Sequence, residues 1–100
     1  MNYKLLMKIK QRPEMYLGKK SITLLHIFLG GYDLCYYEHF GPANDLEQFQ
    51  QFEEFVRLKY NASKSYYNWA GNILNNSTSE EEAFDRFFEL LEEFSNLNCN

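Results

Sequence analysis

The apolar residues of segment 79–94 recur at helical spacing, and this pattern constrains the fold more than any other feature of the chain. The residues of this pattern are Phe84, Phe87, Phe88, Leu91 and Phe94. Side chains three and four positions apart lie on one face of an α-helix, so the segment predicts an amphipathic helix with an aromatic buried side. No run of alternating β-branched residues is long enough to predict a strand.

The other side of the same predicted helix is acidic. The segment contains seven acids and a single base, Arg86. Ser79 and Glu82 match the capping box that starts many helices, and the acids of the first turn complement the positive end of the helix dipole. The acids of the predicted outer side are Glu82, Asp85, Glu89, Glu92 and Glu93.

Residues 21–39 form a second predicted helix that is apolar nearly all round. Ser21 is a suitable N-cap, and Gly41-Pro42 ends the helix. A helix that is apolar on every side is normally buried. Gly30 and Gly31 each cost about 1 kcal/mol relative to alanine inside a helix, a cost tolerated most readily where another backbone packs close. The sequence therefore predicts that this helix is the mostly buried centre of the fold.

Helical patterns also occur at residues 3–10, 45–58 and 64–74. The first pattern stops before Pro13, because the residue that precedes a proline is disfavoured in the α region. One hundred residues, of which 45% are hydrophobic, suit one core. We therefore predict a single all-α domain over residues 1–100, a compact bundle of four to five helices around the second helix.

No constellation of residues indicates catalysis, a metal or a cofactor. The chain has no nucleophile elbow, phosphate-binding glycine loop or Cys-His arrangement. His26 and Asp33 share a helical face but are two turns apart, whereas helical metal sites use spacings of three or four with further ligands. Cys35 and Cys99 do not make a disulfide framework. We predict that the protein is not an enzyme and has no cofactor.

Nothing in the sequence predicts export or insertion into a membrane. Residues 1–18 contain scattered lysines and no uninterrupted apolar core of a signal peptide. No apolar run approaches the ~20 residues that span a bilayer. We expect a cytoplasmic protein with reduced thiols and no membrane partner.

The charge is distributed unevenly along the chain. Residues 1–20 have six bases and one acid, whereas residues 21–100 have four bases and thirteen acids, and the net charge is −4. One-signed charge on this scale steers a basic partner, and neighbouring tyrosines supply anchors for binding. The predicted partner-binding residues are Glu82, Asp85, Glu89, Glu92 and Glu93, together with Asp45, Glu47, Glu54, Tyr66 and Tyr67.

The basic start of the chain leaves nucleic-acid binding open as an alternative, because lysine and arginine contact phosphate groups. Its bases are Lys4, Lys8, Lys10, Arg12, Lys19 and Lys20. The isoelectric point near 5.1 stands against this alternative, since a nucleic-acid-binding domain is normally basic. We expect no direct contact with nucleic acid; these bases either lie against the acidic surface of the protein or are solvated.

Residues 12–18, Arg-Pro-Glu-Met-Tyr-Leu-Gly, resemble a segment near the start of type II topoisomerase ATPase domains. The nucleotide-binding helix, the Asp-x-Gly-x-Gly motif and the glycine-rich lid of that family are missing downstream. The match therefore indicates a local way of ending a helix and implies no binding of ATP.

A broader pattern resembles small bacterial proteins of toxin–immunity loci, including immunity proteins of contact-dependent growth inhibition. It comprises residues 12–18, Leu25-x-x-Phe28-Leu29-x-Gly31-Tyr32, Phe52-x-x-Phe55-Val56, the region of Trp69 and residues 81–91. The resemblance implies an antitoxin role, in which the protein neutralises a cognate toxin domain, often a nuclease, by covering its basic active-site surface. A regulatory or adaptor module that binds another protein is the alternative.

Overall fold

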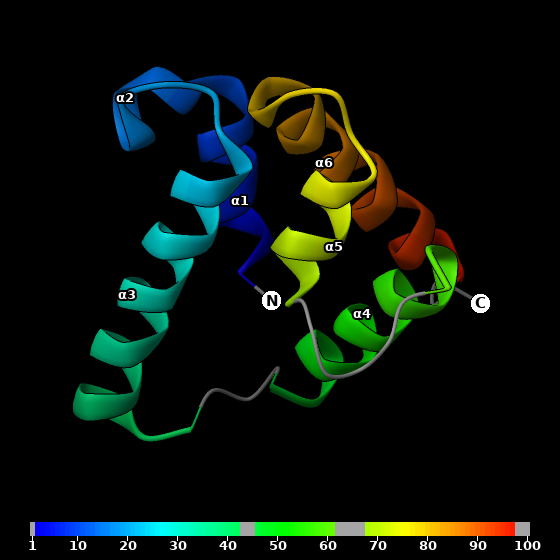
Figure 1. Ribbon diagram of the computed structural model, residues 1–100. Coiled ribbons are helices and arrows are strands. Elements are labelled where there is room, and N and C mark those ends of the chain that lie inside the picture. Colours follow the sequence, from blue (N-terminus) through cyan, green and yellow to red (C-terminus); the bar gives the residue numbers. More distant parts are fainter. Residues whose placement is uncertain (1, 43–45, 62–67, 98–100) are drawn as a thin grey trace.

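Six α-helices follow one another in the part of the chain that the computed structural model describes, residues 2–42, 46–61 and 68–97 (Figure 1). They are α1 (Tyr3–Gln11), α2 (Pro13–Leu17), α3 (Ile22–Phe40), α4 (Leu46–Lys59), α5 (Trp69–Asn75) and α6 (Glu80–Leu97). No strand occurs in those ranges, so the predicted all-α class is confirmed. The helix count exceeds the predicted four to five, because residues Pro13–Leu17, for which no helix is predicted, form the short helix α2.

Helix α6 is the centre of the fold, because its apolar side is covered by the helices around it. Its buried residues are Ala83, Phe84, Phe87, Phe88, Leu90, Leu91 and Phe94. Helices α3, α4 and α5 pack against α6, and the Tyr3 hydroxyl of α1 shares a hydrogen bond of 3.2 Å with the Ser95 hydroxyl. The amphipathic pattern predicted for this segment is therefore confirmed.

Aromatic rings join α4 and α5 to α6. The ring of Phe87 is fully buried and lies 4.9 Å from the Trp69 ring of α5 and 5.6 Å from the Phe52 ring of α4, between centroids. Such ring pairs contribute about 0.5–1.5 kcal/mol beyond the burial of their surface. Phe87 therefore fixes two helices on the third.

The second predicted helix, α3, is not the mostly buried centre, and this prediction is wrong. Ile22 and Leu25 are fully buried, but no residue after Leu29 in α3 is. An ideal Cβ at Gly30 or Gly31 meets nothing within 4 Å, so the predicted close backbone neighbour is missing among the described residues. Apolarity on all sides of a helix does not ensure that the same chain covers them.

The distal half of α3, residues 30–40, therefore stands apart from the packed helices (Figure 1). Its proximal half, residues 22–29, holds it to the body, with the Phe28 ring 6.4 Å from the Tyr16 ring of α2 and the His26 ring 5.3 Å from the Trp69 ring. The distal half adds a hydrogen bond of 3.0 Å from the Asn2 amide to the Tyr32 hydroxyl.

The segment between α1 and α3 is fixed by a proline and a glycine. Pro13 is buried and occupies the first turn of α2, where its missing N–H costs no helical hydrogen bond. Gly18 ends α2 at φ 85°, a conformation that glycine adopts without the steric cost of a side chain. Residues 12–18 therefore form a short helical connection between α1 and α3.

We expect the substitution Phe87→Ala to lower the free energy of unfolding by about 3–5 kcal/mol, because it removes a buried ring from the joint of three helices. Urea denaturation followed by circular dichroism measures this change. Leu58→Ala is the control, since Leu58 is 63% exposed on α4 and its loss should cost under about 0.5 kcal/mol. Equal losses in the two variants would contradict the position of Phe87 in the core.

Candidate functional site

Five predicted acids form an exposed row on α6, which we call the acidic stripe. It consists of Glu82, Asp85, Glu89, Glu92 and Glu93, all of them exposed. The row faces solvent because the aromatic residues between its members turn the opposite side of the helix into the core. The structure thus brings these five residues together, and their role in binding stays a prediction.

Three members of the acidic stripe are paired with cations of the same chain. Lys20 lies 2.8 Å from Asp85, Lys59 lies 3.1 Å from Glu93, and Arg86 lies 3.1 Å from Glu89. Ion pairs in this exposed position contribute about 0–1 kcal/mol each, because water screens them. The pairs lower the negative potential of the stripe without fixing its carboxylates, which can exchange partners.

Two bases of the N-terminal segment also lie against α6. The Lys10 ammonium is 5.8 Å from the centre of the Phe88 ring, and the Lys20 ammonium is 6.0 Å from the centre of the Phe84 ring. Cations attract the faces of aromatic rings at such distances. Part of the basic segment therefore contacts the acidic helix of its own chain. This is the first of the two arrangements expected for these bases, contact with the acidic surface or solvation.

Glu82 caps the start of α6 in a variation of the predicted capping box. Its backbone N–H donates to the Ser79 hydroxyl at 3.0 Å, but its carboxylate accepts from the N–H and the hydroxyl of Thr78, at 3.2 and 2.7 Å. The hydrogen bonds from Thr78 lower the pKa of Glu82. This acid is therefore held by the end of its own helix.

Glu80 is a site residue that sequence reasoning missed. Its carboxylate accepts from the Ser21 hydroxyl at 2.8 Å and from the N–H and hydroxyl of Thr23, at 3.0 and 2.8 Å. Burial raises the pKa of Glu80, but the hydrogen bonds from Thr23 and Ser21 and the charge of Lys19 outweigh it, so the pKa is lowered. Glu80 thus ties the start of α6 to the start of α3.

The other predicted binding residues are not gathered in the same way. Glu47 is exposed on α4, and Glu54 accepts a hydrogen bond of 2.9 Å from the Arg57 guanidinium one turn later on that helix. Asp45, Tyr66 and Tyr67 lie outside the described residues.

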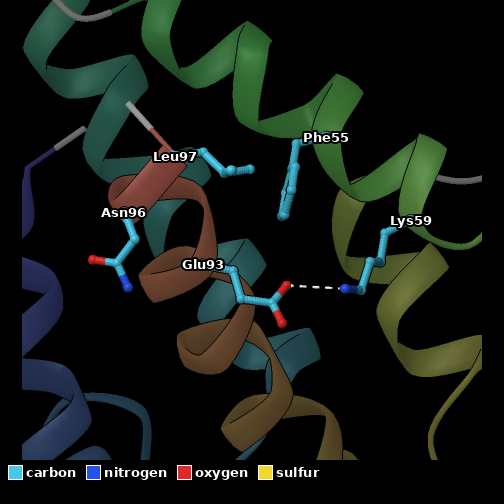
Figure 2. Close-up of a pocket in the computed structure, with 5 residues that line it drawn as sticks. All are labelled: Phe55, Lys59, Glu93, Asn96 and Leu97. Carbon is cyan, nitrogen blue, oxygen red and sulfur yellow. Dashed lines mark hydrogen bonds and ion pairs between the residues drawn. The ribbon is translucent and has the colours of Figure 1, made fainter. Parts of the chain in front are cut away.

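An open pocket of about 400 Å³ lies between α4 and α6, at one end of the acidic stripe. Figure 2 shows Phe55 and Leu97 pointing toward each other there, with Lys59 and Glu93 facing each other at the edge. Asn96 points away from these four side chains. The walls are an aromatic ring, an aliphatic side chain and an ion pair. Such a lining suits contact with another protein better than catalysis.

Besides Asp33, Glu53 is the carboxyl group in the described residues whose pKa is raised by burial. Partial burial on α4 raises its pKa, and the nearby His26 opposes this change. A raised carboxyl pKa is one property of catalytic acids, but it also occurs in structural contacts. His26 itself packs on Trp69, and no group of three metal-ligating side chains forms in the described part of the chain.

No helix in the described ranges is long and apolar enough to span a bilayer. A search of protein-family models, curated proteins and solved structures finds no significant match to this chain. The resemblance to immunity proteins therefore stays a prediction.

We expect Glu80→Gln to lower the free energy of unfolding at pH 7 by about 1–2 kcal/mol, because hydrogen bonds to a charged acceptor are lost or weakened. Glu81→Gln is the matched control, since Glu81 is the next residue, is exposed, and changes the net charge equally. Thermal or urea unfolding of the two variants measures the difference. Identical stabilities would contradict the tie between α6 and α3.

The stabilisation by Glu80 should also depend on pH. Its pKa in the folded state is below the ordinary value of 4.5, so the folded state binds fewer protons than the unfolded state in this range. The contribution is present above pH 4.5 and is lost as the pH falls through the lowered pKa. The gap in stability between the wild type and Glu80→Gln should therefore close on acidification, and a gap that widens would contradict this.

Proposed function

We propose that this chain is a non-catalytic immunity protein that binds and neutralises a cognate toxin domain through the acidic stripe of α6. The observation that supports the proposal is a row of exposed carboxylates on the most firmly packed helix of the fold. A rigid helix holds charges in place before binding, so little conformational entropy is lost when a partner docks.

The spacing of the stripe resembles that of a nucleic-acid backbone. Residues 82–93 span roughly 16 Å along the helix axis at 1.5 Å per residue. The four gaps between the five carboxylates average about 4 Å along this length, comparable to the ~3.4 Å between phosphates of one DNA strand measured along the helix axis. A nuclease domain, whose substrate groove is basic, is therefore the class of toxin that suits this surface best.

The ion pairs on the stripe are compatible with this role. Lys20, Lys59 and Arg86 keep three carboxylates occupied in the free protein, at a net stabilisation small enough for a partner's arginine or lysine to replace them. Glu92, in contrast, has no ion pair or hydrogen bond among the described residues. We expect Glu92 to be the first carboxylate that a basic partner meets.

Growth protection tests the proposal directly. The chain is expressed together with each reading frame that adjoins its gene, and a toxic neighbour whose toxicity the chain abolishes is its partner. The complex should then form at a 1:1 ratio from the purified proteins. If the chain neither binds nor protects against any of the neighbouring products, the proposal is overturned. That result would favour an adaptor whose partner is encoded elsewhere.

Charge neutralisation then tests the role of the stripe. We expect Glu89→Gln, Glu92→Gln and Glu93→Gln together to slow association with the partner at low salt about tenfold or more, with the fold intact. Stopped-flow or biosensor kinetics measures the association rate.

The matched control has the same net charge but leaves α6 unchanged. It combines Glu14→Gln, Asp33→Asn and Glu38→Gln, which replace exposed acids on α2 and α3 that are not among the predicted binding residues. Its association rate should stay within about twofold of the wild type. Equal slowing in both triple variants would show that only the total charge matters, and not the acidic stripe.

A further inference from the structure

The side of α3 that faces away from the core exposes large apolar side chains. Ile27 is 62% exposed, Leu34 61% and Tyr37 60%. At 100° per residue these three lie within one arc, together with Leu24 and the two adjoining glycines. We call this arc the outer face of α3. It consists of Leu24, Ile27, Gly30, Gly31, Leu34 and Tyr37.

The two glycines at the middle of the outer face have no packing partner among the described residues of the monomer. Each costs up to about 1 kcal/mol relative to alanine in a helix. An ideal Cβ at either position meets no atom within 4 Å, so neither a steric conflict nor a close neighbour among the described residues requires glycine. The cost is recovered if a second backbone approaches at this point, because the distance between packed helices depends on the side chains at the contact.

We propose that the outer face of α3 is a homodimer interface, in which two copies of α3 cross in antiparallel orientation at Gly30 and Gly31. A two-fold symmetric contact requires a surface that is complementary to itself. The outer face meets this condition, because its residues are arranged symmetrically about the glycine pair. Gly30 then lies opposite Gly31 of the second copy, Ile27 opposite Leu34, and Leu24 opposite Tyr37.

The charges near the outer face favour the antiparallel orientation. Glu38 is exposed at the end of α3, next to Tyr37 in sequence. In the antiparallel arrangement the two Glu38 carboxylates are separated by roughly 20 Å along the helix axes, at 1.5 Å per residue. A parallel pair would place them side by side, where like charges repel.

The exposed area suits a reversible dimer of two copies. Ile27, Leu34 and Tyr37 together with the glycine backbone expose roughly 400–500 Å², within the ~300–600 Å² of the largest apolar patch on a typical monomer. Two such faces bury at most about 800–1,000 Å² in total, at or just below the lower limit for a specific interface. We therefore expect a weak dimer that forms in the micromolar range. This inference does not depend on the proposed function, since the acidic stripe is on another helix.

Sedimentation velocity between about 1 and 300 µM tests the proposal on the full chain. The wild type should shift from the monomer mass of 12.0 kDa toward twice that value as its concentration rises. Leu34→Glu should remain monomeric over the whole range with an unchanged circular dichroism spectrum. Leu58→Glu is the control, because Leu58 is equally exposed, at 63%, but lies on α4; this variant should dimerise like the wild type.

The glycines give an independent readout. Gly30→Ala with Gly31→Ala should raise the melting temperature at low concentration, where the monomer dominates, because alanine is the better helix former and open space surrounds both positions. The same variant should weaken dimerisation at least tenfold, since the methyl groups hold the two helices apart. A wild type that stays monomeric, a dimer that Leu34→Glu leaves intact or that Leu58→Glu equally abolishes, or tighter association of the alanine variant would overturn the proposal.

Discussion

The burial of the aromatic side of α6 is the interaction on which the rest of the structure depends. Phe87 contacts both Trp69 of α5 and Phe52 of α4, so one ring holds these two helices on α6. Once these rings are inside, the remaining positions of α6 must face water. The acidic stripe is thus a consequence of the core, and the packed helix fixes the backbone positions from which its carboxylates project.

The charges of the molecule are divided between structural and exposed roles. Glu80 and Glu82 hold the start of α6, the first against α3 and the second against Thr78. Lys20 and Lys59 bring cations from other elements onto the stripe. A count of acids along the sequence therefore overstates the negative charge that a partner meets, while it identifies correctly where that charge lies.

The fold class and the exposure of the acidic stripe could be predicted, because both follow from helical periodicity within one segment. The environment of α3 could not. A helix that is apolar on every side gives no indication of which side packs against the rest of the protein. Which helix lies at the centre of the fold depends on the packing of α6 against its neighbours. The contacts of Glu80 were also beyond the sequence pattern, because they join residues 57 and 59 positions apart. The short helix α2 could not be predicted, because a proline can begin a helix as well as end one.

These features describe a domain whose best-packed helix is also its most charged one, and whose most apolar helix is only half covered. Amide hydrogen exchange at about 1 µM, where the chain is monomeric on this account, tests that division most directly. The account predicts the slowest exchange in residues 84–94 of α6 and much faster exchange in residues 30–40 of α3. Slowest exchange in the distal half of α3 would contradict it.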